Sequence, residues 1–185
     1  MSALGGLDAL DVRPGDTLLI LGATGGVGSF AVQLAAQRGA TVVATATAGD
    51  ADAFVRALGA LETIDHTAGD LAEAVRARFP DGVHALLDLL SRDDAFVRMA
   101  GTVRDGGRIA TTQSVADVAA LASRGIHATN IMASPTPAKL TLLAEQVVAG
   151  TLRVEIQQAF PLAETSAALA AYLGGTRGKL VLTMA

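Results

Sequence analysis

Residues 18–35 read Leu18-Leu19-Ile20-Leu21-Gly22-Ala23-Thr24-Gly25-Gly26-Val27-Gly28-Ser29-Phe30-Ala31-Val32-Gln33-Leu34-Ala35. This run indicates a short buried strand, a turn without large side chains and the start of an amphipathic helix. In that order, backbone N–H groups at a helix N-terminus come close to the pyrophosphate of a dinucleotide. Bulky side chains in the turn would hold the phosphates away, so the sequence predicts a dinucleotide site here.

The turn fits the G-x-G-x-x-G fingerprint at Ala23, Gly25 and Gly28, with alanine replacing the first glycine. Gly25 and Gly26 would let the backbone approach the pyrophosphate, and Gly28 would let the helix pack on the sheet. A turn that only packs a helix against a strand is the alternative, but glycines this dense are costly unless the space is needed. The predicted cofactor contacts of the turn are Ala23, Thr24, Gly25, Gly26, Val27 and Gly28.

Composition excludes several function classes for this chain of 185 residues. It contains no cysteine, which excludes a disulfide framework, a thiolate zinc site and a cysteine nucleophile, and favours a reducing cytoplasm. A net charge of −4 without a basic cluster argues against nucleic acid as a partner. No apolar run reaches the roughly 20 residues of a membrane helix, and the N-terminus lacks a signal-peptide pattern. We therefore expect a cytoplasmic α/β protein that acts away from membranes.

Short apolar runs alternate with longer helical patterns over residues 1–135. Strands this apolar, separated by helices, indicate parallel βαβ units in a doubly wound, six-stranded Rossmann sheet. Glycines at Gly39, Gly59, Gly82 and Gly106-Gly107 are expected where helices end and strands begin. The predicted strands are Thr17–Leu21, Thr41–Thr45, Glu62–Ile64, Val83–Leu87, Arg108–Thr111 and Ile126–Met132, and the predicted helices are Val27–Arg38, Asp52–Leu58, Asp70–Phe79, Asp93–Thr102 and Ser114–Ser123.

Residues 136–185 form a short α/β tail with no obvious place in that series. We expect a helix over Pro137–Gly150, a strand over Leu152–Phe160, a helix over Leu162–Leu173 and a last strand over Lys179–Met184. The sequence thus predicts a Rossmann domain over 1–135 and a separate C-terminal segment.

The end of the second predicted strand bears on the choice between NADP and NAD. NAD-specific sheets place an Asp or Glu there to hold the adenosine ribose. Here that position is Ala46, with Thr45 and Thr47 beside it. Without a carboxylate to repel a 2′-phosphate, and with two hydroxyls available, NADP(H) is favoured over NAD(H). Asp50, which follows closely, could still reach back to a ribose.

Other strand ends supply further candidate contacts, because ligands of open α/β sheets bind at the carboxyl ends of the strands. His66 follows the third strand and could meet the adenine or a phosphate, although a solvated histidine is an equal alternative. Leu90 and Ser91 follow the fourth strand, and Thr111 and Thr112 end the fifth. At each of these positions a capping or packing role is the competing interpretation.

Several catalytic patterns are absent from the sequence. The turn leads to Ser29 without a P-loop lysine, and no G-x-S-x-G surrounds a serine. Tyr172 has Thr176 rather than lysine four residues later, and the three histidines lack metal-ligand spacing, so we expect no metal site. No catalytic side chain is named from these residues.

The chain resembles the zinc-independent quinone oxidoreductase branch of the medium-chain dehydrogenases/reductases. The resemblance rests on Asp11-Val12-Arg13-Pro14-Gly15-Asp16-Thr17 followed by the turn Gly22–Gly28, and then on further motifs in order. These are Leu58-Gly59-Ala60, Ile64-Asp65-His66, Asp105-Gly106-Gly107-Arg108 and Gly178-Lys179-Leu180-Val181-Leu182. The resemblance implies NADPH-dependent, metal-free hydride transfer to a quinone or an enone, with the chemistry carried by the nicotinamide.

The same resemblance implies a preceding catalytic domain, to which the tail after Gly150 returns and which forms one wall of the substrate cleft. This chain starts just inside the helix before the cofactor domain, so we expect it to be inactive alone. His66 stands where the family often has Tyr, Leu90-Ser91 where glycine is common, and no basic residue follows Thr47.

Two other functions stay open: a stand-alone nucleotide-binding or interaction module, and an enoyl reductase domain of a multifunctional synthase. The resemblance also implies pairing through the edge strand of the sheet. An apolar unpaired edge favours such contacts, so we expect a homodimer through residues 126–132.

Overall fold

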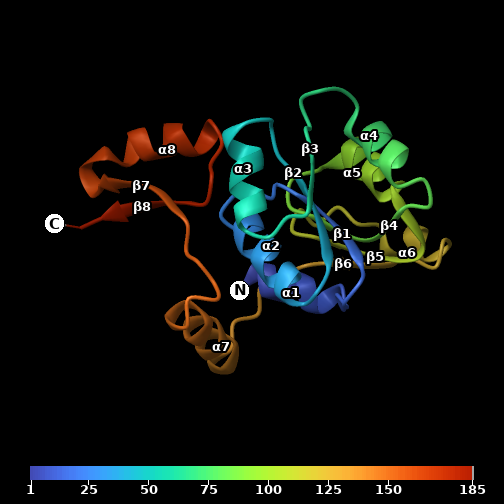
Figure 1. Ribbon diagram of the computed structural model, residues 1–185, viewed down its shortest axis with the longest axis horizontal. Helices are drawn as coiled ribbons and strands as arrows, with labels where there is room; N and C mark the ends of the chain where they lie inside the picture. Colours follow the sequence, from blue (N-terminus) through green and yellow to red (C-terminus); the bar gives the residue numbers. More distant parts are fainter. Residues whose placement is uncertain (185) are drawn as a thin grey trace.

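The computed structural model describes residues 1–184, and its centre is a parallel sheet of six strands (Figure 1). The strands are β1 (Thr17–Leu21), β2 (Thr41–Thr45), β3 (Glu62–Ile64), β4 (Val83–Asp88), β5 (Val103–Thr111) and β6 (His127–Asn130). Their order across the sheet is β3-β2-β1-β4-β5-β6. The order reverses between β1 and β4, as in the doubly wound dinucleotide-binding fold. The predicted Rossmann fold is confirmed.

Each central strand is buried on both faces because helices cover both sides of the sheet. Leu18 and Ile20 of β1 pack against α1 (Ser2–Ala9), α2 (Gly28–Gln37) and α3 (Asp50–Ala57). Leu19 and Leu21 point to the other face, toward α4 (Leu71–Arg78) and α5 (Asp93–Ala100). The period-two alternation of side chains along a strand thus builds two apolar cores.

The fifth strand starts earlier than predicted, at Val103 instead of Arg108. Val83 pairs with Val103 and Ala85 with Arg108, so the register shifts and β5 bulges between these pairs. Gly106 has a φ of +70°, a conformation that glycine adopts without strain. The prediction that Gly106-Gly107 ends a helix is therefore wrong, because these glycines form the bulge inside a strand.

The helix predicted over Ser114–Ser123 is shorter, with α6 covering only Val118–Ala122. The Asn130 side chain bonds both the N–H and the C=O of Ala116, at 3.0 and 3.1 Å. These bonds hold the backbone before Asp117 away from a helical path. The Asp117 carboxylate then caps α6 by accepting from Ala120 N.

The edge strand is also shorter than predicted, since β6 ends at Asn130 rather than Met132. Its pairing with β5 ends at Thr111–Asn130, where β5 itself ends. Ile131 N still donates to Thr111 O, but Met132 is largely exposed. Only residues 127–130 are therefore available as a strand edge.

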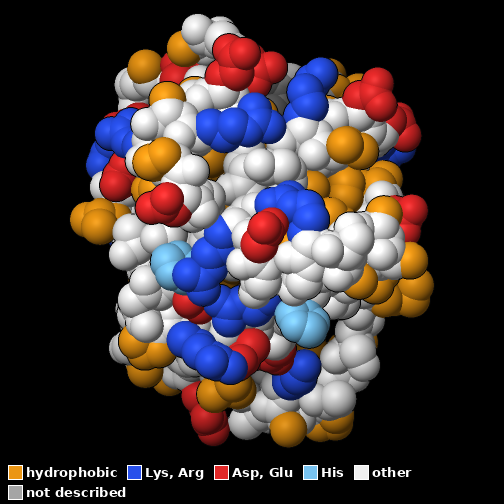
Figure 2. Space-filling view, turned by 90° about the vertical axis from the view of Figure 1, so that its right-hand side faces the viewer, with side chains coloured by type: hydrophobic (Ala, Val, Ile, Leu, Met, Phe, Trp, Pro, Cys, Tyr) orange, Lys and Arg blue, Asp and Glu red, His pale blue; other side chains and the backbone are white. Residues whose placement is uncertain are grey.

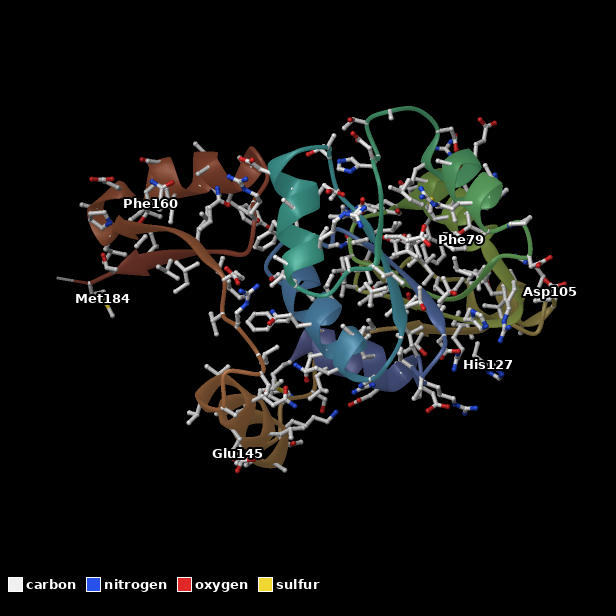
Figure 3. All side chains as sticks on the ribbon, in the orientation of Figure 1. Phe79, Asp105, His127, Glu145, Phe160 and Met184 are labelled. Carbon is white, nitrogen blue, oxygen red and sulfur yellow. The ribbon has the colours of Figure 1, made fainter. Side chains whose placement is uncertain are left out.

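The C-terminal segment forms a second, smaller unit beside the sheet (Figure 1). Helix α7 (Pro137–Val148) is followed by β7 (Ile156–Pro161), a 3₁₀ turn at Leu162–Glu164, α8 (Thr165–Leu173) and β8 (Lys179–Thr183). Strands β7 and β8 form a two-stranded parallel sheet of their own. Figure 3 labels Phe160 and Met184 in this unit and Glu145 on α7, all on the opposite side of the molecule from Asp105.

The predicted strand Leu152–Phe160 starts late because its first residues belong to the main domain. Leu152 is buried in the core under α1 and α2. Arg153 exchanges backbone bonds with the side chain of Gln33 on α2, at 2.8 and 3.1 Å. The strand begins at Ile156, after the chain has left this contact.

Among residues 1–184, no helix has the length and apolar character needed to cross a bilayer.

Candidate functional site

The glycine turn joins β1 to α2 at the carboxyl edge of the sheet. Gly22 has a φ of +76°, its C=O accepts from Gly25 N at 3.2 Å, and Gly25 O accepts from Ser29 N at 2.9 Å. Val27 is the N-cap of α2, and no side chain caps this helix end. The first N–H groups of a helix have no intrahelical acceptor. The Ser29 N–H is engaged by Gly25 O, whereas the N–H groups of Gly26, Val27 and Gly28 have no acceptor among the described residues and are available to an anion.

Gly25 and Gly28 differ in what surrounds them. A Cβ on Gly28 would lie 2.1 Å from Gly22 O and 2.6 Å from Ala23 Cα, so only glycine lets α2 pack this closely on the turn. A Cβ on Gly25 would meet only Gly22 O, at an ordinary 3.5 Å. Packing inside the protein thus explains Gly28 but not Gly25. The space at Gly25 is open to a ligand.

Thr45, at the end of β2, supports the turn from inside. Its hydroxyl accepts from Gly22 N at 3.2 Å and donates to Ile20 O at 3.4 Å, and the residue is 5% exposed. The predicted role of Thr45 as a hydroxyl that meets the cofactor is not supported by this geometry. Its contribution is to hold Gly22 in place.

The loop after β2 is held by Asp65, the residue after β3. Asp65 accepts from Ala48 N at 3.1 Å and from the hydroxyl and N–H of Thr67. The Thr67 hydroxyl, with help from these N–H groups, holds the pKa of Asp65 below its usual value. Ala46 is buried, whereas Thr47 is partly exposed. Of the pair of hydroxyls predicted at this strand end, Thr47 is the one that a ligand can reach.

The loop after β4 lies over the glycine turn. A Cβ on Gly22 would lie 2.9 Å from Leu90 Cγ, although 64% of Leu90 is exposed. The fully buried Asp88 shapes this loop, because its Oδ1 accepts from Leu90 N and Ser91 N at 3.0 and 2.8 Å. Its Oδ2 is buried and has no hydrogen-bond partner among the described residues. Leu90 thus lies beside the turn, and Ser91 follows it in the same loop.

His66 and Ser91 share a cavity of about 290 Å³ at the same edge. Ala95 and Arg98 of α5 and Asp70 at the start of α4 also line it. The structure therefore brings the segments that follow β3 and β4 together around one cavity. His66 is exposed, which leaves its ring accessible from this cavity.

Thr111 and Thr112 differ in accessibility. Thr111 is fully buried, and its hydroxyl accepts from Gln113 N at 3.0 Å. Thr112 is partly exposed and its N–H donates to Asp88 O at 3.2 Å. Gln113 donates to Leu89 O at 2.9 Å and so ties the β5 end to the β4 loop. Of these two threonines, Thr111 is enclosed by the protein and Thr112 is the accessible one.

The sequence reasoning missed a contribution from the C-terminal tail. Gly178 N donates to Thr24 O at 2.7 Å, and a Cβ on Gly26 would lie 3.1 Å from Lys179 Nζ. Lys179 Nζ also lies 5.5 Å from the centre of the Phe30 ring on α2. A lysine ammonium thus lies beside the turn where phosphates are expected. Gly178-Lys179 was visible as a family motif, but its distance along the chain hid this contact.

A second cavity, of about 700 Å³, opens at the opposite, amino-terminal edge of the sheet. Figure 2 shows that side of the molecule, where basic and acidic side chains alternate. Asp16 pairs with Arg108 at 2.7 Å and Arg124 pairs with Asp105. Burial raises the pKa of Asp16, but the Arg13 N–H and Arg108 guanidinium outweigh it, and the pKa lies below its usual value. None of the predicted site residues lies in this cavity.

No group of three or more His, Asp or Glu side chains within residues 1–184 is arranged to hold a metal ion. The chain also has no cysteine.

Comparison with known proteins identifies the family. Residues 26–163 match the model of the family described as zinc-binding dehydrogenase. The 2-haloacrylate reductase of Burkholderia sp is 30% identical over 92% of this chain and 56% of its own length. The spectinabilin polyketide synthase system protein NorB of Streptomyces orinoci is 35% identical over 100% of this chain and 9% of its own length.

A solved structure agrees with these matches. The quinone oxidoreductase from Coxiella burnetii superposes with a TM-score of 0.86 at 30% identity, covering 98% of this chain and 56% of that one. The chain therefore spans just over half the length of the reductase and of the quinone oxidoreductase that it matches. With the glycine turn and the strand order of a cofactor-binding domain, this chain belongs to the zinc-binding dehydrogenase family and is similar to its quinone oxidoreductases.

Proposed function

We propose that this chain is the NADP(H)-binding part of a zinc-independent reductase that transfers hydride to a quinone or an enone. The observation that carries the proposal is the glycine turn. Its helix end is uncapped, and the space at Gly25 is not used by the protein. Names of relatives that include quinone oxidoreductase and 2-haloacrylate reductase support the reaction class.

Different residues of the carboxyl edge would bind different parts of the dinucleotide. The N–H groups of Gly26, Val27 and Gly28 and the Lys179 ammonium would hold the pyrophosphate. Thr47 would lie at the adenosine ribose and His66 at the adenine. When bound, the nicotinamide supplies the hydride, while the protein orients it and excludes water. Leu90, Ser91 and Thr112 would line the path toward the nicotinamide.

We further propose that the C-terminal unit packs against a catalytic domain outside this chain. Many large apolar side chains of β7, α8 and β8 are exposed, including Ile156, Leu169 and Leu173. Exposed apolar surface of this extent marks an interaction site. The boundary at residue 135 stays a prediction, and Leu152 already crosses it by packing into the main core. No catalytic side chain is assigned to this chain.

The match to a polyketide synthase protein favours a second candidate function with the same hydride-transfer chemistry. The aligned segment covers the whole chain but only 9% of NorB. An enoyl reductase segment of a multifunctional synthase would align over its whole length to a small part of such a protein. The surrounding reading frame separates the two: further synthase domains support this alternative, and a lone catalytic domain supports the stand-alone reductase.

We also propose a homodimer through the free edge of β6. His127, Thr129 and Asn130 are exposed, and in the described sheet β6 pairs only with β5. Light scattering over a wide concentration range tests this, and a monomer throughout would overturn it. The cytoplasmic location stays a prediction from the lack of cysteine.

Nucleotide fluorescence tests the central proposal. Titration of this chain with NADPH and NADH should show saturable binding, with NADPH tighter. Gly25→Val should abolish binding because a branched side chain would occupy the phosphate space, while the fold is kept. Gly5→Val is the matched control, since its Cβ has nothing within 4 Å. If neither nucleotide binds, or if Gly25→Val binds like the parent, the turn only packs a helix.

A further inference from the structure

Residues 177–179 of the tail run along the carboxyl edge from the glycine turn to the start of α3. Lys179 lies beside Gly26, Gly178 N bonds Thr24 O, and Arg177 Nη1 lies 2.9 Å from Asp50 Oδ2. Figure 1 shows the chain after α8 passing beside α3. Three consecutive residues thus reach from the expected pyrophosphate to the loop after β2, where the adenosine ribose is expected.

The β2–α3 loop itself offers no cation to a 2′-phosphate. No Lys or Arg lies between Thr45 and Val55. Arg56 is committed elsewhere, because it pairs with Asp52 at 3.0 Å and donates to Leu61 O and to the Thr63 hydroxyl. Arg177 differs from Arg56. Among the described residues, its guanidinium bonds a single side chain, the exposed Asp50.

The backbone that presents Arg177 is fixed in place. Arg177 N donates to Gln157 Oε1 at 2.7 Å. A Cβ on Gly178 would lie 2.3 Å from Glu155 O, so this turn packs tightly on the start of β7. Only the side chain of Arg177 is left to move, and it is 45% exposed. An arginine on a rigid support suits a charged ligand, because little backbone freedom is lost on binding.

We propose that Arg177 binds the 2′-phosphate of NADP(H) and that Asp50 holds its guanidinium at the ribose position until the nucleotide arrives. The proposal rests on the proposed dinucleotide function and assigns its choice of nucleotide. Asp50 is 88% exposed, and exposed ion pairs of this kind are weak. A phosphate carries more charge than a carboxylate and matches the guanidinium fork, so Arg177 gains by the exchange.

Adenine nucleotides that differ only in the 2′-phosphate test this assignment on the chain as it is. Adenosine 2′,5′-bisphosphate and 5′-AMP are titrated calorimetrically into the parent and into Arg177→Gln. We expect Arg177→Gln to bind the bisphosphate about tenfold more weakly than the parent, which is the effect of losing one charge-assisted hydrogen bond. Binding of 5′-AMP should change less than about twofold, because the two nucleotides differ only by the group that Arg177 binds.

Two further variants make the test specific. Asp50→Asn should tighten binding of the bisphosphate, because removing a like charge beside the phosphate outweighs the loss of a weak, exposed pair with Arg177. Arg13→Gln is the matched control, because it removes the same charge at the amino-terminal edge, where Arg13 lines the other cavity. Arg13→Gln should leave both nucleotides unchanged.

The outcomes separate the two proposals. If Arg177→Gln weakens both nucleotides equally or neither, Arg177 does not read the 2′-phosphate, and that assignment falls while dinucleotide binding stands. A parent that binds 5′-AMP as tightly as the bisphosphate has the same consequence. If the parent binds no adenine nucleotide or dinucleotide, both proposals fall together.

Discussion

The two edges of the sheet differ in whether their polar groups have hydrogen-bond partners within the protein. At the amino-terminal edge, Asp16 and Arg108 pair at 2.7 Å while 11% and 15% of their side chains are exposed. His84 Nδ1 accepts from Thr17 N at 3.1 Å. At the carboxyl edge, α2 has no side-chain cap and one oxygen of the buried Asp88 has no partner among the described residues.

This difference distinguishes polar groups that stabilise the fold from polar groups that are open to a ligand. Polar groups that bond one another, as at the amino-terminal edge, are already satisfied and stabilise the fold. Groups left open in a tightly packed protein indicate a ligand or solvent that completes them. The larger cavity lies at the amino-terminal edge, so cavity size and open polar groups indicate different sides of the molecule.

The largest effect is expected at the turn, from Gly28→Ala. The added Cβ would lie 2.1 Å from Gly22 O, and backbone must move to relieve the contact. We expect a loss of about 4 kcal/mol in the free energy of unfolding, at the upper end for a single substitution. Urea denaturation measures it. The control is Gly5→Ala in α1, which meets nothing within 4 Å and should stabilise slightly; equal effects would contradict the packing argument.

The next effect belongs to the amino-terminal edge, from Asp16→Asn. This change leaves the largely buried Arg108 without its carboxylate, so we expect a loss of about 2 kcal/mol in the free energy of unfolding. Nucleotide binding should be unchanged, because Asp16 lies at the far edge. Urea denaturation and NADPH titration together check this. If Asp16→Asn lost NADPH binding but kept the parent's free energy of unfolding, the assignment of different roles to the two edges would be contradicted.

A smaller effect is expected from Lys179→Gln at the carboxyl edge. Because the pyrophosphate is common to both dinucleotides, NADPH and NADH should each bind about tenfold more weakly, which corresponds to about 1.4 kcal/mol. Fluorescence titration measures both. This equal loss contrasts with the selective loss expected for Arg177→Gln. Unchanged affinity for both would remove Lys179 from the site.

The smallest effect is the pH dependence contributed by His84. Burial, assisted by Arg104, lowers the pKa of His84 from its ordinary 6.5. The unfolded chain therefore takes up the proton first as the pH falls, and stability decreases from about pH 6.5 down to the folded pKa. Above that window the contribution is complete. Urea midpoints at several pH values should show a slope that His84→Gln flattens; an identical slope in the variant would contradict this.

How far the sequence predicts the molecule differs between elements. Strands β1, β2 and β3 have the predicted bounds, because continuous apolar runs between turn residues leave one arrangement for a buried parallel strand. Prediction failed at β5 and α6, where the outcome depends on partners far along the chain. The bulge in β5 needs the register against β4, and the short α6 needs Asn130.

The candidate site divides in the same way. The glycine turn was visible because its requirement is local: a strand, small residues and a helix start must follow one another. Thr45 is predicted as a cofactor contact because a hydroxyl at a strand end is polar in the sequence, whereas in the structure this hydroxyl bonds Gly22. The positions of Lys179 beside Gly26 and of Arg177 beside Asp50 were not predicted, because nothing local in the sequence connects these residues.

The sequence by itself determined the fold class, the bounds of the first three strands and the place of the turn, since apolar runs and glycine chemistry are properties of neighbouring residues. Tertiary structure alone decided which polar groups are satisfied and which cations reach the edge. Residues more than a hundred positions apart, such as Thr24 and Gly178, meet there. Such contacts depend on how packed elements return to one another, and the order of residues along the chain does not encode them locally.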